Sequence, residues 1–229
     1  LLHSEQGLGD TIQFFRYAKL VKALGARVIM EVPKPLVSLL QGLGGVDELV
    51  EKGEPLPYFD YYCPLMSLPL AFKTELNTVP SLTPYLQSDN KKVAKWKERL
   101  GEKTSLRIGL VWNGSAEFIK YDYKRSITLD ALMKYLPDQF EYVCLQNKIR
   151  DTDKDALKKS TIKYFGAEIN DFTENAALCE VMDLVISVDT FVAHLSGALG
   201  KPTWVLLPYV PDWRWMLDRD DSPWYGSTK

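Results

Sequence analysis

One stretch of the sequence combines residue types that could hold a phosphate group. Residues 184–198, LVISVDTFVAHLSGA, place Asp189 and Thr190 between an apolar strand and a predicted helix, with His194 one turn into that helix. Free N–H groups at a helix start, such as that of Phe191, attract anions with the help of the helix dipole. Ligands of open α/β sheets also bind beyond the carboxyl ends of strands. The pattern therefore predicts a phosphate site, although an N-capped helix with a packed histidine explains the same residues.

A second candidate is the opening stretch HSEQGLGDTIQFF, residues 3–15. Gly7 and Gly9 are typical of a dinucleotide loop, but Ile12 stands where that fingerprint needs a third glycine, and Asp10 would repel a phosphate. On the face of a cleft, the aspartate could instead accept a proton from the hydroxyl of an acceptor, for which the two glycines leave room. Capping of a helix that begins at residue 11 is the structural alternative.

A third cluster, WNGSAEFIKYDYKRS at residues 112–126, follows a predicted strand. Gly114 lets the backbone approach a ligand, and Asn113 offers a hydrogen bond, so both are candidates for contacts with a nucleoside. Lys124 and Arg125 could neutralise a diphosphate, and the guanidinium offers bidentate geometry. A solvated charged loop is the alternative interpretation.

Aromatic residues supply two further candidates. Phe172 lies at the start of another predicted helix at the same sheet edge, where it could stack on a nucleobase. A hydrophobic staple for that helix is the alternative. Near the end of the chain, residues 212–226 (DWRWMLDRDDSPWYG) could either pack at a seam between domains or form a platform for a sugar.

Composition narrows the class of protein. The chain has 229 residues and a formal net charge of −2, with 46% hydrophobic and 25% charged residues. This is ordinary for a globular protein and lacks the basic excess of general nucleic-acid or membrane-surface binders. No apolar run reaches the roughly 18 to 20 residues that cross a bilayer. We expect no nucleic-acid partner and no transmembrane segment.

The three cysteines, Cys63, Cys144 and Cys179, are widely separated and odd in number, so they do not form a disulfide framework. The chain has no CxxC pair and only two histidines, which argues against a metal site built from histidines. We expect free thiols in a reducing cytoplasm and no bound metal. Because the chain begins without a methionine and ends in a polar tail, we interpret it as a piece of a longer protein.

The hydrophobic pattern predicts two β–α series joined by a charged helix at residues 90–103. In the first series we expect strands at 1–3, 27–32, 48–50 and 59–65 and helices at 11–24 and 34–41. In the second we expect strands at 106–112, 140–146, 161–166, 184–188 and 203–208 and helices at 129–136, 152–159, 174–183 and 191–199. Gly25 is the expected stop of the first helix, and Thr128 and Thr173 are expected N-caps.

This alternation predicts an α/β fold with mainly parallel sheets. We expect two Rossmann-like domains that face each other across a cleft. The predicted units are an acceptor-side domain at 1–88, a linker helix at 89–105 and a nucleotide-sugar-binding domain at 106–229.

Together these segments resemble glycosyltransferases of the GT-B fold, in the ADP-heptose:lipopolysaccharide heptosyltransferase group (glycosyltransferase family 9). More closely, they resemble the transferase-like domains that follow tetratricopeptide repeats in bacterial proteins. The resemblance covers nearly the whole chain. It is specific in residues 187–202, SVDTFVAHLSGALGKP, which are similar to the family's D-T-G-x-x-H-L-x-x-A-L segment, and in the Gly-Asp pair before the first helix.

For the first domain, the resemblance implies that Asp10 is the general base.

For the second domain, the resemblance implies that Lys124, in a KRSI segment that lacks the family's Trp-Pro, contacts the donor phosphate together with Arg125. The carboxylate that binds the ribose would lie in QNKIRDTD, as Asp151 or Asp153.

For the second domain, the resemblance implies that Asp189, Thr190 and His194 belong to the site of the donor diphosphate, which backbone amides hold. Phe191 replaces the family's glycine after Asp-Thr, which alters the closest approach of backbone to phosphate. Phe172 takes the position beside the nucleobase.

The implied activity is a metal-independent, inverting transfer of a heptosyl or hexosyl group from a nucleotide-diphosphate sugar to a glycan, lipid-linked or protein acceptor. No cofactor besides this donor substrate is expected, and a tetratricopeptide region could precede the chain in the full protein. The competing interpretation is a non-catalytic, transferase-like domain that binds a nucleotide or glycan or scaffolds partners. A nucleotide-sugar epimerase shares the architecture, whereas the missing third glycine argues against an NAD-dependent oxidoreductase.

Overall fold

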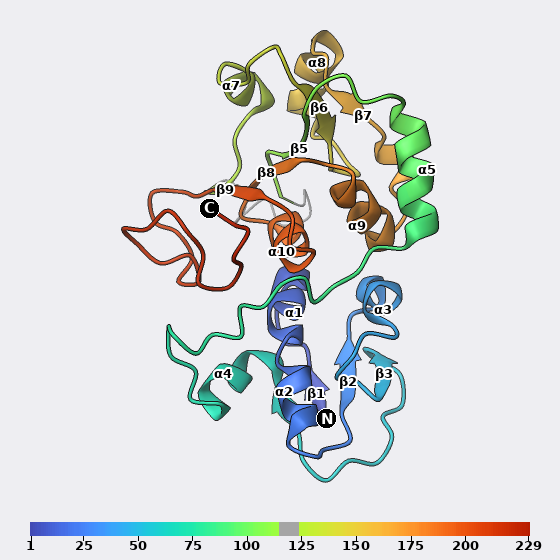
Figure 1. Ribbon diagram of the computed structural model, residues 1–229, viewed down its shortest axis with the longest axis vertical. Coiled ribbons are helices and arrows are strands. Elements are labelled where there is room, and N and C mark those ends of the chain that lie inside the picture. Colours follow the sequence, from blue (N-terminus) through green and yellow to red (C-terminus); the bar gives the residue numbers. More distant parts are fainter. Residues whose placement is uncertain (115–123) are drawn as a thin grey trace.

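Two parallel β-sheets form the framework of the computed structural model, which describes residues 1–114 and 124–229 (Figure 1). The first sheet has the strand order β3-β2-β1-β4, and the second has the order β7-β6-β5-β8-β9. The strands of the first sheet are β1 (Leu2–His3), β2 (Ile29–Val32), β3 (Glu48–Glu51) and β4 (Cys63–Pro64). Those of the second are β5 (Arg107–Val111), β6 (Glu141–Cys144), β7 (Lys163–Tyr164), β8 (Leu184–Val188) and β9 (Thr203–Leu206). All the strand pairs are parallel, as the β–α alternation predicts.

Helices follow most strands and cover the sheets on their faces. The α-helices are α1 (Leu8–Phe15), α2 (Ala18–Ala23), α3 (Lys34–Leu40), α4 (Leu68–Ala71), α5 (Asn90–Leu100), α7 (Leu129–Met133), α8 (Asp151–Lys159), α9 (Phe172–Glu180) and α10 (Phe191–Ala198). Short 3-10 helices occupy Leu65–Ser67 and Gly166–Glu168. Side chains of α7 and α8 pack on one face of the second sheet, and those of α5, α9 and α10 pack on the other. Burial on both faces explains why every residue of β5 is buried.

The beginning of the chain differs from the prediction of one helix at 11–24. Helix α1 begins at Leu8, with Gly7 as its N-cap, and the chain breaks into a second helix, α2, after Arg16 and Tyr17. Asp10 is therefore the third residue of the helix and not a cap for one that begins at residue 11. Gly25, with a positive φ of 87°, follows α2 as predicted.

Two other local predictions have different outcomes. Thr128 caps α7 as expected, because its hydroxyl accepts the N–H of Ala131 at 3.3 Å. The predicted cap of α9 at Thr173 is wrong. The carboxylate of Asp171 accepts the N–H groups of Thr173 and Glu174, both at 2.9 Å, so the helix begins earlier. The predicted strands at 59–65 and 161–166 are each reduced to two residues, β4 and β7.

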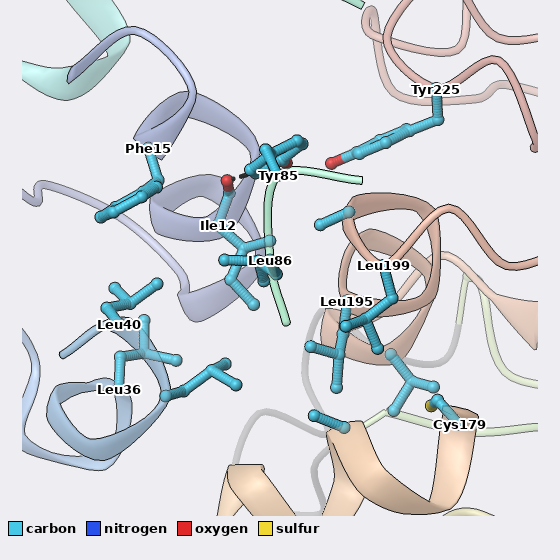
Figure 2. Packing of buried hydrophobic residues seen from close by; sticks show 14 of the residues in the cluster. Ile12, Phe15, Leu36, Leu40, Tyr85, Leu86, Cys179, Leu195, Leu199 and Tyr225 are labelled. Carbon is cyan, nitrogen blue, oxygen red and sulfur yellow. Dashed lines mark hydrogen bonds between the residues drawn. The ribbon is translucent and has the colours of Figure 1, made fainter. Parts of the chain in front are cut away.

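A single hydrophobic cluster runs from the first sheet to the second. Figure 2 shows its central part, where Ile12 of α1, Leu86 of the segment between α4 and α5, and Leu195 of α10 lie close together. Tyr85 donates its hydroxyl to the carbonyl of Ile12 at 3.0 Å. Its backbone N–H bonds to Ala198 at the end of α10, also at 3.0 Å. The two halves therefore share an apolar seam, while the predicted domain limits at 88 and 105 stay predictions.

The C-terminal segment closes this seam. Its last residues run parallel to β9, with bonds of 3.0 Å from Thr203 N to Ser227 O and 2.9 Å from Lys229 N to Thr203 O. Trp215, Trp224 and Tyr225 are buried, which confirms packing for most of the aromatic residues in 212–226.

Buried Arg16 fastens this segment to α1. It donates to the carbonyls of Pro80 (3.1 Å) and Trp224 and to the Tyr85 hydroxyl (3.0 Å).

Candidate active site

Helices α1 and α10 meet at the seam, and their contact brings the two predicted sites together (Figure 1). Gly9 of α1 lies against the ring of His194. A Cβ atom at position 9 would come within 2.6 Å of the His194 Cδ2 atom, which is shorter than any normal contact. Glycine is therefore required here by close approach of the two helices. The result is that Asp10, next along α1, lies beside the helix that carries the Asp189–His194 motif.

The carboxylate of Asp10 has two partners. Its Oδ2 atom accepts the backbone N–H of Gly7 at 2.9 Å, which is one of the two bonds of a capping box; the other bond cannot form because Gly7 has no side chain. Its Oδ1 atom accepts Nη2 of Arg214 at 2.6 Å. The carboxylate therefore bonds within the first turn of α1 and also reaches the C-terminal segment, while its role as a general base stays a prediction.

Arg214 was not predicted as a site residue, because Asp10 lies 204 residues away in the sequence. Its neighbours in the chain hold it in place. Trp213 stacks on Phe14 of α1 with ring centroids 6.4 Å apart, and Trp215 stacks on His194 of α10 at 5.5 Å. We call residues 212–216 the bridging segment because it contacts both helices. The only signal in the sequence was the arginine between the two tryptophans.

His194 is a buried, neutral side chain. Its Nδ1 atom lies 2.9 Å from the Tyr225 hydroxyl, and its Nε2 atom lies 3.8 Å from Oδ1 of Asp189. Burial lowers the pKa of His194 well below its ordinary value, and the positive charges of Arg214 and two other arginines lower it further. At neutral pH the ring can therefore serve a ligand through hydrogen bonds but not through charge.

Asp189 lies at the carboxyl end of β8. Burial raises the pKa of its carboxyl group, and the nearby positive charges of Arg214 and Arg125 act in the opposite direction. Arg125 donates Nη1 to the Asp189 backbone carbonyl at 2.8 Å. The structure thus brings Arg125 to the turn between β8 and α10, as expected for a group that would face a diphosphate there.

The start of α10 retains the features of an anion site. Thr190 is the N-cap residue, but its hydroxyl lies 3.0 Å from Ser187 Oγ and does not cap the helix. The first N–H groups of α10 receive no acceptor from this side chain. Phe191 packs against Phe172 of α9, with ring centroids 4.1 Å apart and the rings tilted by 40°. Lys124 is exposed, and residues 115–123 lie outside the described part of the chain.

Phe172 lines a cavity of about 290 Å³ at the seam. The cavity is lined by Lys34, Pro35, Asn147, Ile169, Asn170, Asp171, Phe172 and Asn175, so residues of both halves contribute to it. Three asparagines next to an aromatic ring suit the edge and face of a nucleobase. A larger cavity of about 480 Å³ lies between α3, the start of α5 and α9, and none of the predicted site residues line it.

Asn113 is committed to the interior of the second half. Its amide donates to Asp153 at 3.1 Å and accepts from Gln146 at 2.8 Å. Asp153 is 3% exposed and also accepts the indole N–H of Trp112 at 3.0 Å. Of the two carboxylates considered for the ribose, Asp151 is the exposed one, so Asp153 has a structural role. The N–H of Gly114 bonds to Ser126 Oγ at 3.4 Å, and the predicted nucleoside contacts of Asn113 and Gly114 stay predictions.

Residues 1–114 and 124–229 contain neither a candidate metal site nor a helix that could span a membrane. These residues contain no group of three His, Cys, Asp or Glu side chains arranged to hold a metal ion. None of the helices in this part of the chain has both the length and the apolar character needed to span a bilayer.

Solved structures with the same architecture are glycosyltransferases. A glycosyl transferase of family 9 from Veillonella parvula superimposes with a TM-score of 0.66 over 91% of this chain and 81% of its own, at 12% sequence identity. ADP-heptose LPS heptosyltransferase II from E. coli superimposes with a TM-score of 0.60 over 100% of this chain and 88% of its own, also at 12% identity. The chain has the GT-B fold of glycosyltransferase family 9.

Other comparisons extend this picture. The iron-containing dodecameric glycosyltransferase TibC from enterotoxigenic E. coli shares the GT-B architecture with a TM-score of 0.54, 10% identity, and coverage of 89% of this chain and 56% of its own. In sequence, the chain is 24% identical over 260 aligned positions to Protein FlbA of Caulobacter vibrioides. The alignment covers 100% of this chain but only 42% of FlbA, so the chain spans less than half the length of that protein. No protein-family model matches the sequence.

Proposed function

We propose that the chain is a metal-independent, inverting glycosyltransferase that moves a heptosyl or hexosyl group from a nucleotide-diphosphate sugar to a hydroxyl acceptor. The observation that carries the proposal is the contact of Gly9 with His194 within a GT-B fold. This contact puts Asp10 of one half beside the start of α10 in the other half. A candidate base and a candidate diphosphate site thus face the same seam.

The proposed reaction is a single displacement. Asp10 takes the proton of the acceptor hydroxyl, whose oxygen forms a bond to the anomeric carbon from the face opposite the nucleotide. The bond from that carbon to the diphosphate oxygen breaks, and its electron pair leaves with the nucleoside diphosphate. Arg125, Lys124 and the first N–H groups of α10 stabilise the charge on the leaving group, so fixed cations and the helix dipole do the work that a metal does elsewhere.

The remaining parts of the site are assigned by position. Phe172 and the asparagines around its cavity hold the nucleoside, while Thr190 and neutral His194 add hydrogen bonds to the diphosphate. The turn at Gly7 and Gly9 leaves room for the acceptor, which is a glycan, a lipid-linked sugar or a protein. We place this activity in the bacterial cytoplasm, in a longer protein in which a tetratricopeptide region precedes the domain.

A specific observation favours the second candidate, a non-catalytic domain that binds a nucleotide or glycan or scaffolds partners. Phe191 occupies the position of the family's glycine and packs against the ring of Phe172. Both oxygens of Asp10 are also engaged, by Gly7 and Arg214. A domain that has lost transfer would show such changes.

Thermal unfolding in the presence of ADP, UDP, GDP and their sugars separates the two candidates. A nucleotide at about 100 times its Kd adds about 2.7 kcal/mol of stability, which for a chain of this size corresponds to a rise in Tm of about 5 to 10 °C. We expect such a rise with one nucleotide class. The rise should be lost in Arg125→Gln but not in Arg27→Gln, which changes an exposed arginine before β2 that pairs with Glu48. If no nucleotide raises the Tm, the transferase proposal fails and the scaffold interpretation is supported.

A further inference from the structure

The bridging segment places Arg214 between the candidate base and the candidate diphosphate site. Its Nη2 atom bonds to Asp10 on α1, and its Nε atom lies 3.4 Å from the carboxylate of Asp212. The next residue, Trp215, is stacked on His194 of α10. The side chain of Arg214 is only 10% exposed, so this guanidinium is fixed at the seam and is not a freely hydrated surface charge.

The electrostatic environment points the same way. The charge of Arg214 lowers the pKa of the His194 ring and opposes the rise in the pKa of the Asp189 carboxyl, and the neighbouring Trp215 stacks on His194, so the guanidinium lies near this end of α10. Its buried Nε–H makes no hydrogen bond among the described residues, although the Asp212 carboxylate lies 3.4 Å from Nε as an ion pair. A guanidinium with unused donors matches the oxygens of a diphosphate, which it can bind in a bidentate manner.

The resting arrangement also restrains Asp10. One carboxylate oxygen accepts the Gly7 N–H and the other accepts Arg214, so an acceptor hydroxyl would have to compete with a charged donor for Oδ1. A diphosphate arriving beside Asp189 brings more negative charge than Asp10 carries. The arginine is therefore attracted away from the carboxylate at the moment when the base is needed.

We propose that Arg214 is a donor-operated guard of the catalytic base, which leaves Asp10 for the diphosphate of the nucleotide sugar when the donor binds. This inference rests on the proposed function. Arg214 binds the donor directly and in the same movement uncovers Oδ1 of Asp10, so the carboxylate becomes available only in the complex with donor. The order of binding follows, with the donor first and the acceptor second.

Calorimetric titration with ADP, UDP and GDP tests whether Arg214 leaves Asp10 for the diphosphate when a nucleotide binds. Because Asp10 competes with the diphosphate for Arg214, Asp10→Asn should tighten nucleotide binding by about three- to tenfold. The asparagine oxygen can still accept the Gly7 N–H, so this bond at the start of α1 is retained. Arg214→Gln should weaken binding by about 10- to 100-fold, as expected for a lost charge-assisted bond. In the double variant the tightening caused by Asp10→Asn should vanish.

Arg219→Gln is the matched control, since Arg219 belongs to the same stretch and pairs with exposed Asp221 at 2.7 Å. It should leave the Kd unchanged. If a nucleotide binds and Asp10→Asn leaves the Kd unchanged or raises it, the inference about Arg214 is wrong while the proposed function stands. This outcome can be measured even if the Arg214 variant does not fold. If the wild type binds none of the three nucleotides, the proposed function fails, and the inference fails with it.

Discussion

Replacement of Gly9 by alanine tests whether α1 and α10 meet as closely as the candidate site requires. The new methyl group would lie 2.6 Å from Cδ2 and 3.3 Å from Nε2 of His194. The ring cannot easily move away, because its Nδ1 atom is bonded to Tyr225 and its face is stacked on Trp215. The helices must therefore separate by several tenths of an ångström or more.

Two opposing terms set the magnitude. Overpacking in a well-packed interior costs about 1–3 kcal/mol, whereas alanine in place of glycine within a helix gains about 0.5–1 kcal/mol. The net loss should be about 1–2 kcal/mol, which lowers the Tm by about 2 to 8 °C for a chain of this length.

The assay is thermal unfolding followed by circular dichroism, with Gly226→Ala as the control. Position 226 has open space around the added methyl group and an ordinary backbone conformation, so its Tm should stay within about 1 °C of the wild type. In a His194→Ala background, Gly9→Ala should become neutral or stabilising, because the clash is removed. A rise in Tm for Gly9→Ala in the wild-type background would refute the close contact.

Three further predictions concern buried polar groups. Arg16→Ala should lower the free energy of unfolding by at least about 3 kcal/mol in urea titrations, because it breaks several bonds of a buried charge, whereas Arg27→Ala at an exposed pair should change it by less than about 1 kcal/mol. Burial raises the pKa of Glu141, but hydrogen bonds from Arg107 and Thr104 outweigh this effect and lower the pKa from 4.5 to about 2. The carboxylate therefore stabilises the fold above pH 4.5 and loses that effect as the pH falls toward 2. Between pH 5 and pH 2, the free energy of unfolding of Glu141→Gln should therefore fall by on the order of 2 kcal/mol less than that of the wild type, measured by urea unfolding at several pH values. Asp153→Asn should lower the Tm by about 4 to 10 °C, because Oδ2 accepts from Trp112 and Asn113 and Oδ1 accepts from Leu129, so an amide NH2 in place of either oxygen faces at least one donor; an unchanged Tm would contradict this network.

The second half of the chain was the easier part to predict. Residues 108–111 are an apolar run and residues 184–188 are apolar except for Ser187, as is typical of buried parallel strands, and α10 follows its strand with a glycine stop at Gly200. These signals are local, so they can be read without knowledge of tertiary contacts. The two predicted clusters at Asp189 and Arg125 meet because the carboxyl ends of parallel strands share one edge of the sheet.

The first helix shows where local signals fail. Two glycines in GLGD suggest a loop, yet α1 begins at Leu8, with Gly9 inside the helix against His194 and the Asp10 carboxylate bonded to the Gly7 N–H. At α9 we expected Thr173 as the cap, but the backbone conformation selects Asp171. Arg214 carried only the weak signal of an arginine between two tryptophans, since its partner is fixed by how the C-terminal segment folds back.

The measurement that bears most directly on the central claim is the release of nucleoside diphosphate by Asp10→Asn at saturating donor, with the nucleotide sugar that raises the wild type's Tm. The account predicts a fall in the rate of about 10²- to 10⁴-fold, as for loss of a general base, with nucleotide binding at least as tight as in the wild type and an unchanged circular dichroism spectrum. Turnover at the wild-type rate in this variant would contradict the assignment of Asp10 as the base.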